Sequence, residues 1–210
     1  MRVIAGKVKG RKLRSAPGDV TRPITDRVKE SLFNILGDEV VDALFLDLFA
    51  GTGSVGIEAL SRGARRVVFV ERNRRAIETI KENLKITGLA DQAEVIRADV
   101  FRFLAREPAI PLPPCPPKLG GLRGEGERGG APKERFDLIY IAPPQYKGLW
   151  AETLLALDGG GFLIEGGLAI AQIFPKEYKD LELNSLSLVD QRKYGSTMLC
   201  FYAFSVSGDK

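Results

Sequence analysis

The sequence predicts an α/β domain whose sheet is mostly parallel, covered by helices on both faces, and finished by an antiparallel pair of strands. From residue 43 onward, short apolar runs alternate with helical patterns, which is typical of βαβ units. A glycine-rich segment, 47–56, joins the first run to the first helix of that series. A chain of 210 residues suits one such domain with a small extension. We therefore divide it into a basic extension, 1–20, and a core domain, 21–210.

The N-terminal extension is predicted to form a small basic hairpin. Residues 2–5 and 11–14 are strand-like and are joined by a segment that carries glycine and lysine. Residues 1–18 contain six Lys or Arg and no Asp or Glu, a balance that suits binding to a phosphate backbone. The alternative is a solvated basic terminus without a partner. After the extension, Thr25 is a suitable N-cap for an amphipathic helix that ends near residue 36.

Within the core, strands and helices alternate along the chain. Apolar and β-branched runs predict strands at residues 44–48, 66–70, 94–97, 136–141, 168–174, 183–189 and 198–204. Periodic apolar positions and capping signals predict helices at residues 54–62, 74–87 (capped by Asn73), 100–106 and 149–157. The last two strands are close enough in sequence to pair antiparallel.

One stretch does not fit this alternation. Residues 107–134 contain seven of the twelve prolines and six glycines, so neither a helix nor a strand can run through them. We expect an exposed insertion between the helix at 100–106 and the strand at 136–141. A loop of this length and composition is usually a linker or a disordered segment, and the alternative is a loop that grips a substrate.

The composition excludes several classes of protein. The chain has no histidine, which removes the commonest general base and the commonest metal ligand. Its two cysteines, Cys115 and Cys200, offer neither a disulfide framework nor metal-ligand spacing, so we expect no metal. No apolar run approaches the roughly 18 residues of a membrane span, and the basic N-terminus lacks the apolar region of a secretory signal. We expect a cytoplasmic monomer that does not bind membranes.

The glycine-rich segment carries the most information about function. Gly51, Gly53 and Gly56 fit the pattern G-x-G-x-x-G, in which absent side chains allow a tight turn and a close approach of a ligand to a helix N-terminus. One acidic residue, Asp47, precedes the glycines, and another, Glu71, follows Gly53 by 18 positions at the end of the next strand. A carboxylate at that strand end can accept both hydroxyls of an adenosine ribose.

One further consideration favours S-adenosylmethionine over NAD as the cofactor. Asp47 can receive the cationic amine of an amino-acid moiety, which S-adenosylmethionine has and NAD lacks, whereas it would repel the pyrophosphate of NAD. Asp99, after the third strand, can accept from an adenine amino group or, alternatively, act as a helix N-cap. A nicotinamide-dependent oxidoreductase is the alternative, because it uses the same glycine pattern. The predicted cofactor-binding residues are Asp47, Phe49, Ala50, Gly51, Thr52, Gly53, Gly56, Glu71, Arg72, Asp99 and Val100.

Six short motifs are spread over nearly the whole chain outside residues 107–134. They are Arg22-Pro23-Ile24-Thr25-Asp26-Arg27-Val28-Lys29-Glu30, Leu32-Phe33-Asn34-Ile35-Leu36, the segment 47–56, Ala59-Leu60-Ser61-Arg62-Gly63-Ala64, Glu82-Asn83-Leu84 and Lys193-Tyr194-Gly195. Together they resemble the motifs of the RsmD-type 16S ribosomal RNA guanine-N2 methyltransferases. The combination of Arg-Pro-x-Thr-Asp-Arg with Asp-Leu-Phe-Ala-Gly-Thr-Gly is fairly specific, whereas the glycine pattern alone indicates only a methyltransferase-like fold.

The resemblance implies a Rossmann-like class I methyltransferase fold with seven strands, S-adenosylmethionine as methyl donor, and a basic hairpin that helps to hold RNA. The implied reaction is methyl transfer to the exocyclic N2 amine of a guanine in small-subunit ribosomal RNA. The partner is then ribosomal RNA or an assembly intermediate of the small subunit. The residues expected to bind RNA are Arg2, Lys7, Lys9, Arg11, Lys12, Arg14, Arg22 and Arg27.

The resemblance also implies a catalytic motif after the fourth strand, where the family has Asp or Asn, then Pro-Pro and an aromatic residue. The matching positions are Ala142-Pro143-Pro144-Gln145, with Tyr146 one position later, and we assign Ala142, Pro143, Pro144 and Tyr146 to the catalytic site. A side-chain oxygen and a backbone carbonyl can orient the amine, and Ala142 supplies no side-chain oxygen. One alternative is that the prolines only terminate a strand. Another is an RNA-binding or ribosome-assembly protein in which efficient catalysis has been lost.

Overall fold

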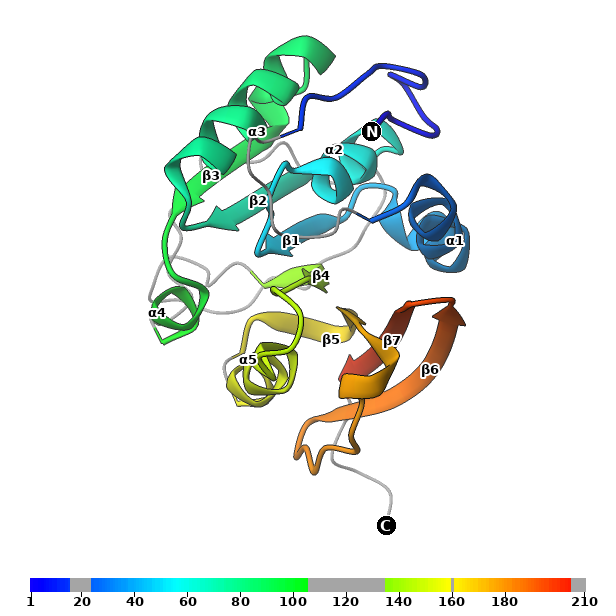
Figure 1. The fold of residues 1–210 in the computed structure, drawn as a ribbon, viewed down its shortest axis with the longest axis vertical. Helices are drawn as coiled ribbons and strands as arrows, with labels where there is room; N and C mark the ends of the chain where they lie inside the picture. Colours follow the sequence, from blue (N-terminus) through cyan, green and yellow to red (C-terminus); the bar gives the residue numbers. More distant parts are fainter. Residues whose placement is uncertain (16–23, 106–134, 160, 205–210) are drawn as a thin grey trace, which may run out of the picture.

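The computed structural model describes residues 1–15, 24–105, 135–159 and 161–204. Its strands are β1 (Leu44–Leu48), β2 (Arg66–Glu71), β3 (Ala93–Arg97), β4 (Phe136–Ile141), β5 (Leu163–Ile173), β6 (Leu186–Tyr194) and β7 (Thr197–Phe204). They form one sheet in the order β3-β2-β1-β4-β5-β7-β6 (Figure 1). Strands β1 to β5 run parallel, while β7 pairs antiparallel with both β5 and β6. The predicted mostly parallel sheet with a C-terminal antiparallel hairpin is confirmed.

Helices cover both faces of this sheet and create two apolar layers. The first layer lies under α1 (Asp26–Leu36), α2 (Ser54–Ser61) and α3 (Arg74–Thr87), and the second under α4 (Val100–Leu104) and α5 (Leu149–Asp158) (Figure 1). Short 3₁₀ turns are η1 (Gly37–Val40), η2 (Ala90–Gln92) and η3 (Pro175–Glu177). Side chains alternate along the buried strand β1, so Phe45 packs in the first layer and Leu46 in the second. By the same alternation Asp47 points toward the layer that α2 covers.

The predicted helix boundaries follow from capping chemistry. At the start of α1, Oγ1 of Thr25 accepts from the N–H of Val28 at 3.3 Å. At the start of α3, Oδ1 of Asn73 accepts from the N–H of Arg75 at 2.9 Å. Gly88, with φ 71°, ends α3 in the left-handed conformation that favours glycine. Both predicted caps are confirmed.

Three elements differ by more than one residue from the ranges that the sequence predicts. β5 begins at Leu163 rather than at 168. The glycines at 166 and 167 do not end the strand but form an irregularity within it, where the pairing with β4 shifts register and Gly166 has φ 75°. β6 is displaced toward its polar residues, since an edge strand pairs on one side only and tolerates exposed charged side chains. The helix α4 ends at Leu104, before the predicted end at 106.

The predicted N-terminal hairpin is a short turn held by few bonds. One bridge joins Arg2 to Lys12, and the N–H of Val3 donates to the carbonyl of Arg11 at 3.0 Å. The buried side chains of Val3 and Leu13 pack into the first apolar layer. This basic arm, residues 1–15, lies across α2 and beside α3 (Figure 1). The predicted site residue Arg22 and the whole of the predicted insertion, 107–134, lie outside the described residues.

Candidate active site

The glycine-rich segment forms a tight turn, here called the glycine turn, between the carboxyl end of β1 and the N-terminus of α2. Its backbone has positive φ at Phe49 (59°), Gly51 (56°) and Gly53 (75°). Gly56 allows close packing, because a Cβ there would lie 2.3 Å from Cε1 of Phe69 on β2. A Cβ on Gly51 would meet nothing nearer than the carbonyl oxygen of Phe49, at 3.9 Å. In the part of the chain that the structure describes, this side of the turn is therefore open to a ligand.

Asp47 lies on β1 behind the turn, and only 2% of the residue is exposed. Its Oδ2 accepts from the N–H of Gly56 at 3.0 Å, which fixes the first turn of α2 against the sheet. Burial raises the pKa of this carboxyl group well above 3.8, the Gly56 hydrogen bond lowers it, and the charge of Glu71 raises it again. Tyr140 is its neighbour in the register of β4, and burial together with the charge of Asp47 raises the pKa of that phenol. A buried carboxyl group with a high affinity for protons thus stands directly behind the turn.

Glu71, at the end of β2, organises the turn with both oxygens of its carboxylate. Its Oε2 accepts from the N–H of Gly51 at 3.0 Å. Its Oε1 accepts from the N–H groups of Arg72 and Asn73, at 2.9 and 2.8 Å. A carboxylate offers about four lone-pair sites, so these bonds leave an acceptor position for a further donor. Glu71 therefore ties the glycine turn to the loop after β2.

Asp99 acts as the N-cap of α4, so this interpretation of the residue is confirmed. Its Oδ1 accepts from the N–H groups of Phe101 and Arg102, at 3.1 and 3.3 Å. Its Oδ2 lies 4.0 Å from a guanidinium nitrogen of the exposed Arg72. Val100, the first residue of α4, is buried in the second apolar layer. Asp99 and Arg72 thus meet at the carboxyl ends of β2 and β3, the same edge at which the glycine turn lies.

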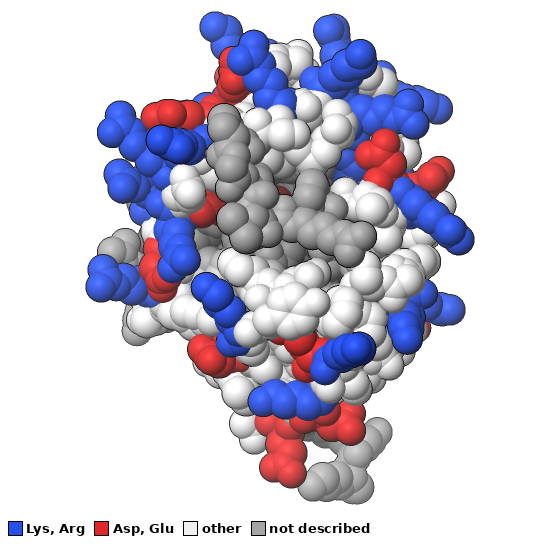
Figure 2. All heavy atoms as spheres, viewed as in Figure 1, with Lys and Arg blue, Asp and Glu red and all other residues white. Residues whose placement is uncertain are grey.

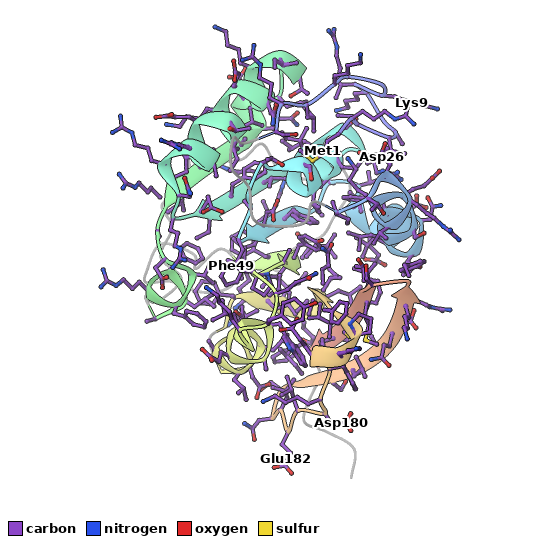
Figure 3. All side chains as sticks on the ribbon, viewed as in Figure 1. Met1, Lys9, Asp26, Phe49, Asp180 and Glu182 are labelled. Atoms are coloured by element: carbon purple, nitrogen blue, oxygen red, sulfur yellow. The ribbon has the colours of Figure 1, made fainter. Side chains whose placement is uncertain are left out.

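The segment that follows β4 starts next to the glycine turn. The N–H of Ala142 donates to the carbonyl of Leu48 at 3.4 Å, so Ala142 lies beside the residue that precedes Phe49. Figure 3 shows Phe49 where β1 and β4 end. The two prolines after Ala142 are half-buried. Tyr146 has φ 63° and is 70% exposed, and its ring centroid lies 5.3 Å from that of Phe174, which follows β5. Phe174 carries no sequence signal of its own, and only this ring contact identifies it.

The basic arm is anchored by a buried carboxylate of α2. Glu58, which is 0% exposed, accepts from the N–H groups of Ile4 and Ala5, at 2.8 and 2.9 Å. It also pairs with Nζ of Lys29 at 3.2 Å and with Nε of Arg62 at 3.0 Å. The Lys29 side chain is 2% exposed, and its ammonium donates to a backbone carbonyl of the arm at 2.7 Å. The backbone of the arm is therefore docked on the core.

The arm presents its cations to solvent. Arg2 pairs with Asp26 at 3.2 Å, and Arg14 pairs with Glu82 at 2.6 Å, while Arg27 is exposed on α1. Four exposed residues form no ion pair with any described residue, and we call them the arm cations: Lys7, Lys9, Arg11 and Lys12. Lys9 points away from the sheet in Figure 3. Figure 2 shows Lys and Arg standing out along the rim where the arm and α3 lie.

Three residues that fix the arm are not apparent from periodicity: Glu58, Lys29 and Asn83, whose side chain bonds the backbone of Arg14. Glu58 lies within an apolar helix, and Lys29 lies among the buried positions of α1. A charged residue at a core position needs a partner of opposite sign, so these two together carry a usable signal. Asn83 belongs to one of the six motifs, but its spacing indicates no role.

Other features of the surface do not compete with this site. A pocket lined in part by Asp38, Glu39 and Asp137 lies at the amino-terminal edge of the sheet, whereas ligands of open α/β sheets bind at the carboxyl ends. In the part of the chain that the structure describes, no cluster of acidic, Cys or His side chains could hold a metal ion. No helix among the described residues is long and apolar enough to cross a membrane.

Similar proteins identify the family. YlbH of Bacillus subtilis is 37% identical over 203 residues, which cover 96% of this chain and 98% of that protein. Ribosomal RNA small subunit methyltransferase D of Escherichia coli is 34% identical over 168 residues, which cover 80% of this chain and 72% of that protein. The solved structure of yhhF from Escherichia coli matches with a TM-score of 0.77 and 29% identity over 97% of both chains. The resemblance is thus confirmed, and the chain belongs to the family described as conserved hypothetical protein 95, whose model matches residues 1–111 and 123–203.

Proposed function

We propose that this chain transfers a methyl group from S-adenosylmethionine to the exocyclic N2 amine of a guanine in small-subunit ribosomal RNA. The observation that carries this proposal is the junction of β1 and β4, where the glycine turn and the Ala142-Pro143-Pro144 segment leave neighbouring strand ends. The glycine turn, which would bind the cofactor, and the segment that would hold the amine must be adjacent, because the methyl carbon and the amine nitrogen lie about 3 to 3.5 Å apart before the displacement. Family membership, with a relative named as a ribosomal RNA methyltransferase, supports the substrate class.

The residues present fit S-adenosylmethionine. Gly51 leaves one side of the turn open, Glu71 retains an acceptor position for a ribose hydroxyl, and Asp47 offers a buried carboxyl group to an ammonium. When bound, this cofactor supplies an electrophilic methyl group on a sulfonium sulfur. A buried carboxylate behind the turn would meet the pyrophosphate of NAD with the wrong sign, which argues against the nicotinamide alternative.

The contribution of the chain itself is to position the amine. The lone pair of a purine amine is conjugated with the ring, so the amine is a poor nucleophile until its N–H groups are held. The backbone carbonyls of Ala142 and Pro143 are the acceptors available for that purpose. Tyr146, exposed beside Phe174, can stack on a base that has left its helix. A nitrogen–carbon bond forms as the sulfur–carbon bond breaks, and the amine then releases one proton to solvent.

The basic arm extends this proposal to the RNA. Its arm cations are exposed and form no ion pair among the described residues, so they are available to phosphates. Contacts to phosphate position an RNA without selecting the base. We propose that the chain acts in the cytoplasm as a monomer, on ribosomal RNA that is free or within an assembly intermediate of the small subunit.

Ala142 favours a second candidate function, that of an RNA-binding or ribosome-assembly protein without efficient catalysis. The test is single-turnover methylation of small-subunit RNA by this chain and by its Ala142→Asp variant. One missing orienting hydrogen bond is worth about 100- to 1,000-fold in rate, and a rise of that order in the variant supports the positioning role. If the unaltered chain is already fast, the backbone carbonyls or the amide oxygen of Gln145 suffice to orient the amine. If neither protein methylates RNA, the proposed reaction is refuted in favour of the second function or of a different substrate.

A further inference from the structure

Asn83, on α3, joins two segments that the proposed function assigns to different ligands. Its side-chain oxygen accepts from the N–H of Arg14 at 2.7 Å, and its amide nitrogen donates to the carbonyl of Arg14 at 3.1 Å. The same nitrogen donates to the carbonyl of Thr52 at 3.0 Å. Both donor positions of the amide are therefore used. Asn83 is 0% exposed, and its bond to the Thr52 carbonyl is buried, whereas its two bonds to Arg14 are part-buried.

The two partners of Asn83 belong to the basic arm and to the glycine turn. Arg14 is at the end of the arm, and Thr52 lies between the two glycines with positive φ. A second, weaker contact links the same two segments, since the hydroxyl of Thr52 lies 3.7 Å from Sδ of Met1. Asn83 itself is held rigidly, because its helix packs through Ile80 and Leu84 into the first apolar layer.

We propose that Asn83 is a positioning residue that couples RNA binding by the arm to cofactor binding by the glycine turn. This inference rests on the proposed function. Moving the arm away from α3 breaks both bonds to Arg14 and frees the amide that also holds the Thr52 carbonyl. A docked arm and an ordered turn therefore favour one another. When one ligand orders its segment, the other segment becomes more ordered too, and the second ligand then loses less conformational entropy on binding. Each ligand should therefore increase the affinity for the other.

The coupling is measured first on the unaltered protein. The dissociation constant of a small-subunit RNA transcript is determined with and without saturating S-adenosylhomocysteine, and that of S-adenosylhomocysteine with and without the RNA. We expect each ligand to tighten the other by about fivefold or more, and by the same factor in both directions, as linkage requires. A factor of one in the unaltered protein overturns the inference without any variant.

Variants then assign the coupling to this residue. Asn83→Ala should reduce the factor to within about twofold of unity, because the link to both segments is removed. The matched control is Glu82→Ala, which removes the exposed ion pair between the arm residue Arg14 and the adjacent position of α3 but leaves the link to the turn. The control should keep the coupling. Equal coupling in Asn83→Ala and the unaltered chain overturns the assignment, and thermal unfolding of each variant identifies a loss that comes from misfolding.

Hydrogen exchange offers a readout that needs no variant. The amide of Arg14 donates to Asn83, so saturating S-adenosylhomocysteine should slow exchange in the peptide that covers residues 1–15 of the unaltered protein. Unchanged exchange there, with cofactor demonstrably bound, contradicts the inference. A chain that methylates RNA but shows no coupling refutes this inference alone, whereas a chain that binds no S-adenosylhomocysteine refutes the proposed function.

Discussion

Replacing Asp47 by asparagine separates the two tasks that a carboxyl group at this position can perform. One task is structural, since Oδ2 accepts from the N–H of Gly56 at 3.0 Å and an asparagine oxygen can accept the same bond. The other is the proposed contact with the ammonium of the cofactor, which needs the negative charge. The side chains are nearly isosteric, so the variant removes the charge and little else. Any loss of cofactor affinity then reports on the charge itself.

The structure sets the expected size of both effects. A hydrogen bond between ionised partners contributes about 1.5 to 3 kcal/mol, so Asp47→Asn should weaken S-adenosylmethionine binding roughly 10- to 150-fold. The unliganded fold should not lose stability, because Asp47 is 2% exposed and burial of an ionised carboxylate is unfavourable. We expect the melting temperature of the unliganded variant to equal or exceed that of the unaltered chain.

The pH dependence follows from the direction of the pKa shift. Burial, opposed by the Gly56 bond and aided by the charge of Glu71, raises the pKa of Asp47 in the folded protein well above 3.8. The folded chain then binds the proton more tightly than the unfolded chain does, so stability falls as pH rises from 3.8 toward the folded pKa. The variant lacks this titration. Its stability relative to the unaltered chain should therefore increase across that window.

Isothermal calorimetry with S-adenosylmethionine measures the affinity, and thermal unfolding between pH 4 and pH 8 measures the stability. Unchanged affinity in Asp47→Asn refutes the assignment of Asp47 to the ammonium. A variant that is destabilised at every pH shows instead that the fold needs the carboxylate, which contradicts the expectation from desolvation.

Three further predictions test the fold and the arm. Glu58→Gln should lower the free energy of unfolding by about 3 to 5 kcal/mol, because the buried Lys29 ammonium loses its carboxylate. The control Glu78→Gln removes an exposed ion pair with Arg74 and should lower that free energy by less than about 0.5 kcal/mol. Equal losses of the two variants in urea denaturation contradict the reasoning. Burial disfavours the charge of Asp158, but hydrogen bonds from the chain at residues 184–186 outweigh it and lower its pKa below 3.8. Asp158→Asn should therefore cost about 1 to 3 kcal/mol at pH 7, and the difference should shrink as pH falls below 3.8, where a pH-independent loss would argue against the ionised form. Neutralising the arm cations should make the RNA affinity less dependent on salt. The slope of log binding constant against log salt concentration should fall in magnitude by about 0.7 to 0.9 for each phosphate that the arm no longer neutralises. An unchanged slope would mean that these cations contact no phosphate.

Periodicity predicts the core of this fold because burial enforces it. The strand β1 is buried along its whole length and reads as a continuous apolar run broken only by Asp47. The boundaries of α1 and α3 are encoded locally by Thr25 and Asn73, whose side chains satisfy backbone N–H groups within three residues. Such elements need no knowledge of the rest of the chain.

The errors arise where the decisive partner is distant in sequence. The glycines at 166 and 167 indicate a turn, yet β5 continues through them because β4 supplies a register that absorbs the extra residues. The segment 183–185 has strand-like composition, but its backbone N–H groups at 184 and 185 donate to the carboxylate of Asp158. Asp158 lies 26 positions before Asn184. Local composition cannot reveal an acceptor on another element.

The candidate site shows the same division between local and distant information. The glycine spacing and the acidic residues at strand ends are visible in the sequence, and the structure brings them to one edge of the sheet. Their cofactor roles stay predictions. Glu71 and Asp99 already hold backbone N–H groups of the turn and of α4, a use that the sequence indicates only for Asp99.

The prior use of these carboxylates changes how a substitution at the site must be interpreted. Glu71 holds the N–H of Gly51 at 3.0 Å, so its removal disturbs the glycine turn even before a ribose is bound. A lower cofactor affinity in a Glu71 variant would then have two causes, the loss of a bond to the ribose and a less ordered glycine turn. Asn83 holds the same turn through the carbonyl of Thr52. The turn is therefore held from β2 and from α3 at once. Because Asn83 also holds Arg14, the order of the basic arm becomes part of the organisation of the cofactor site.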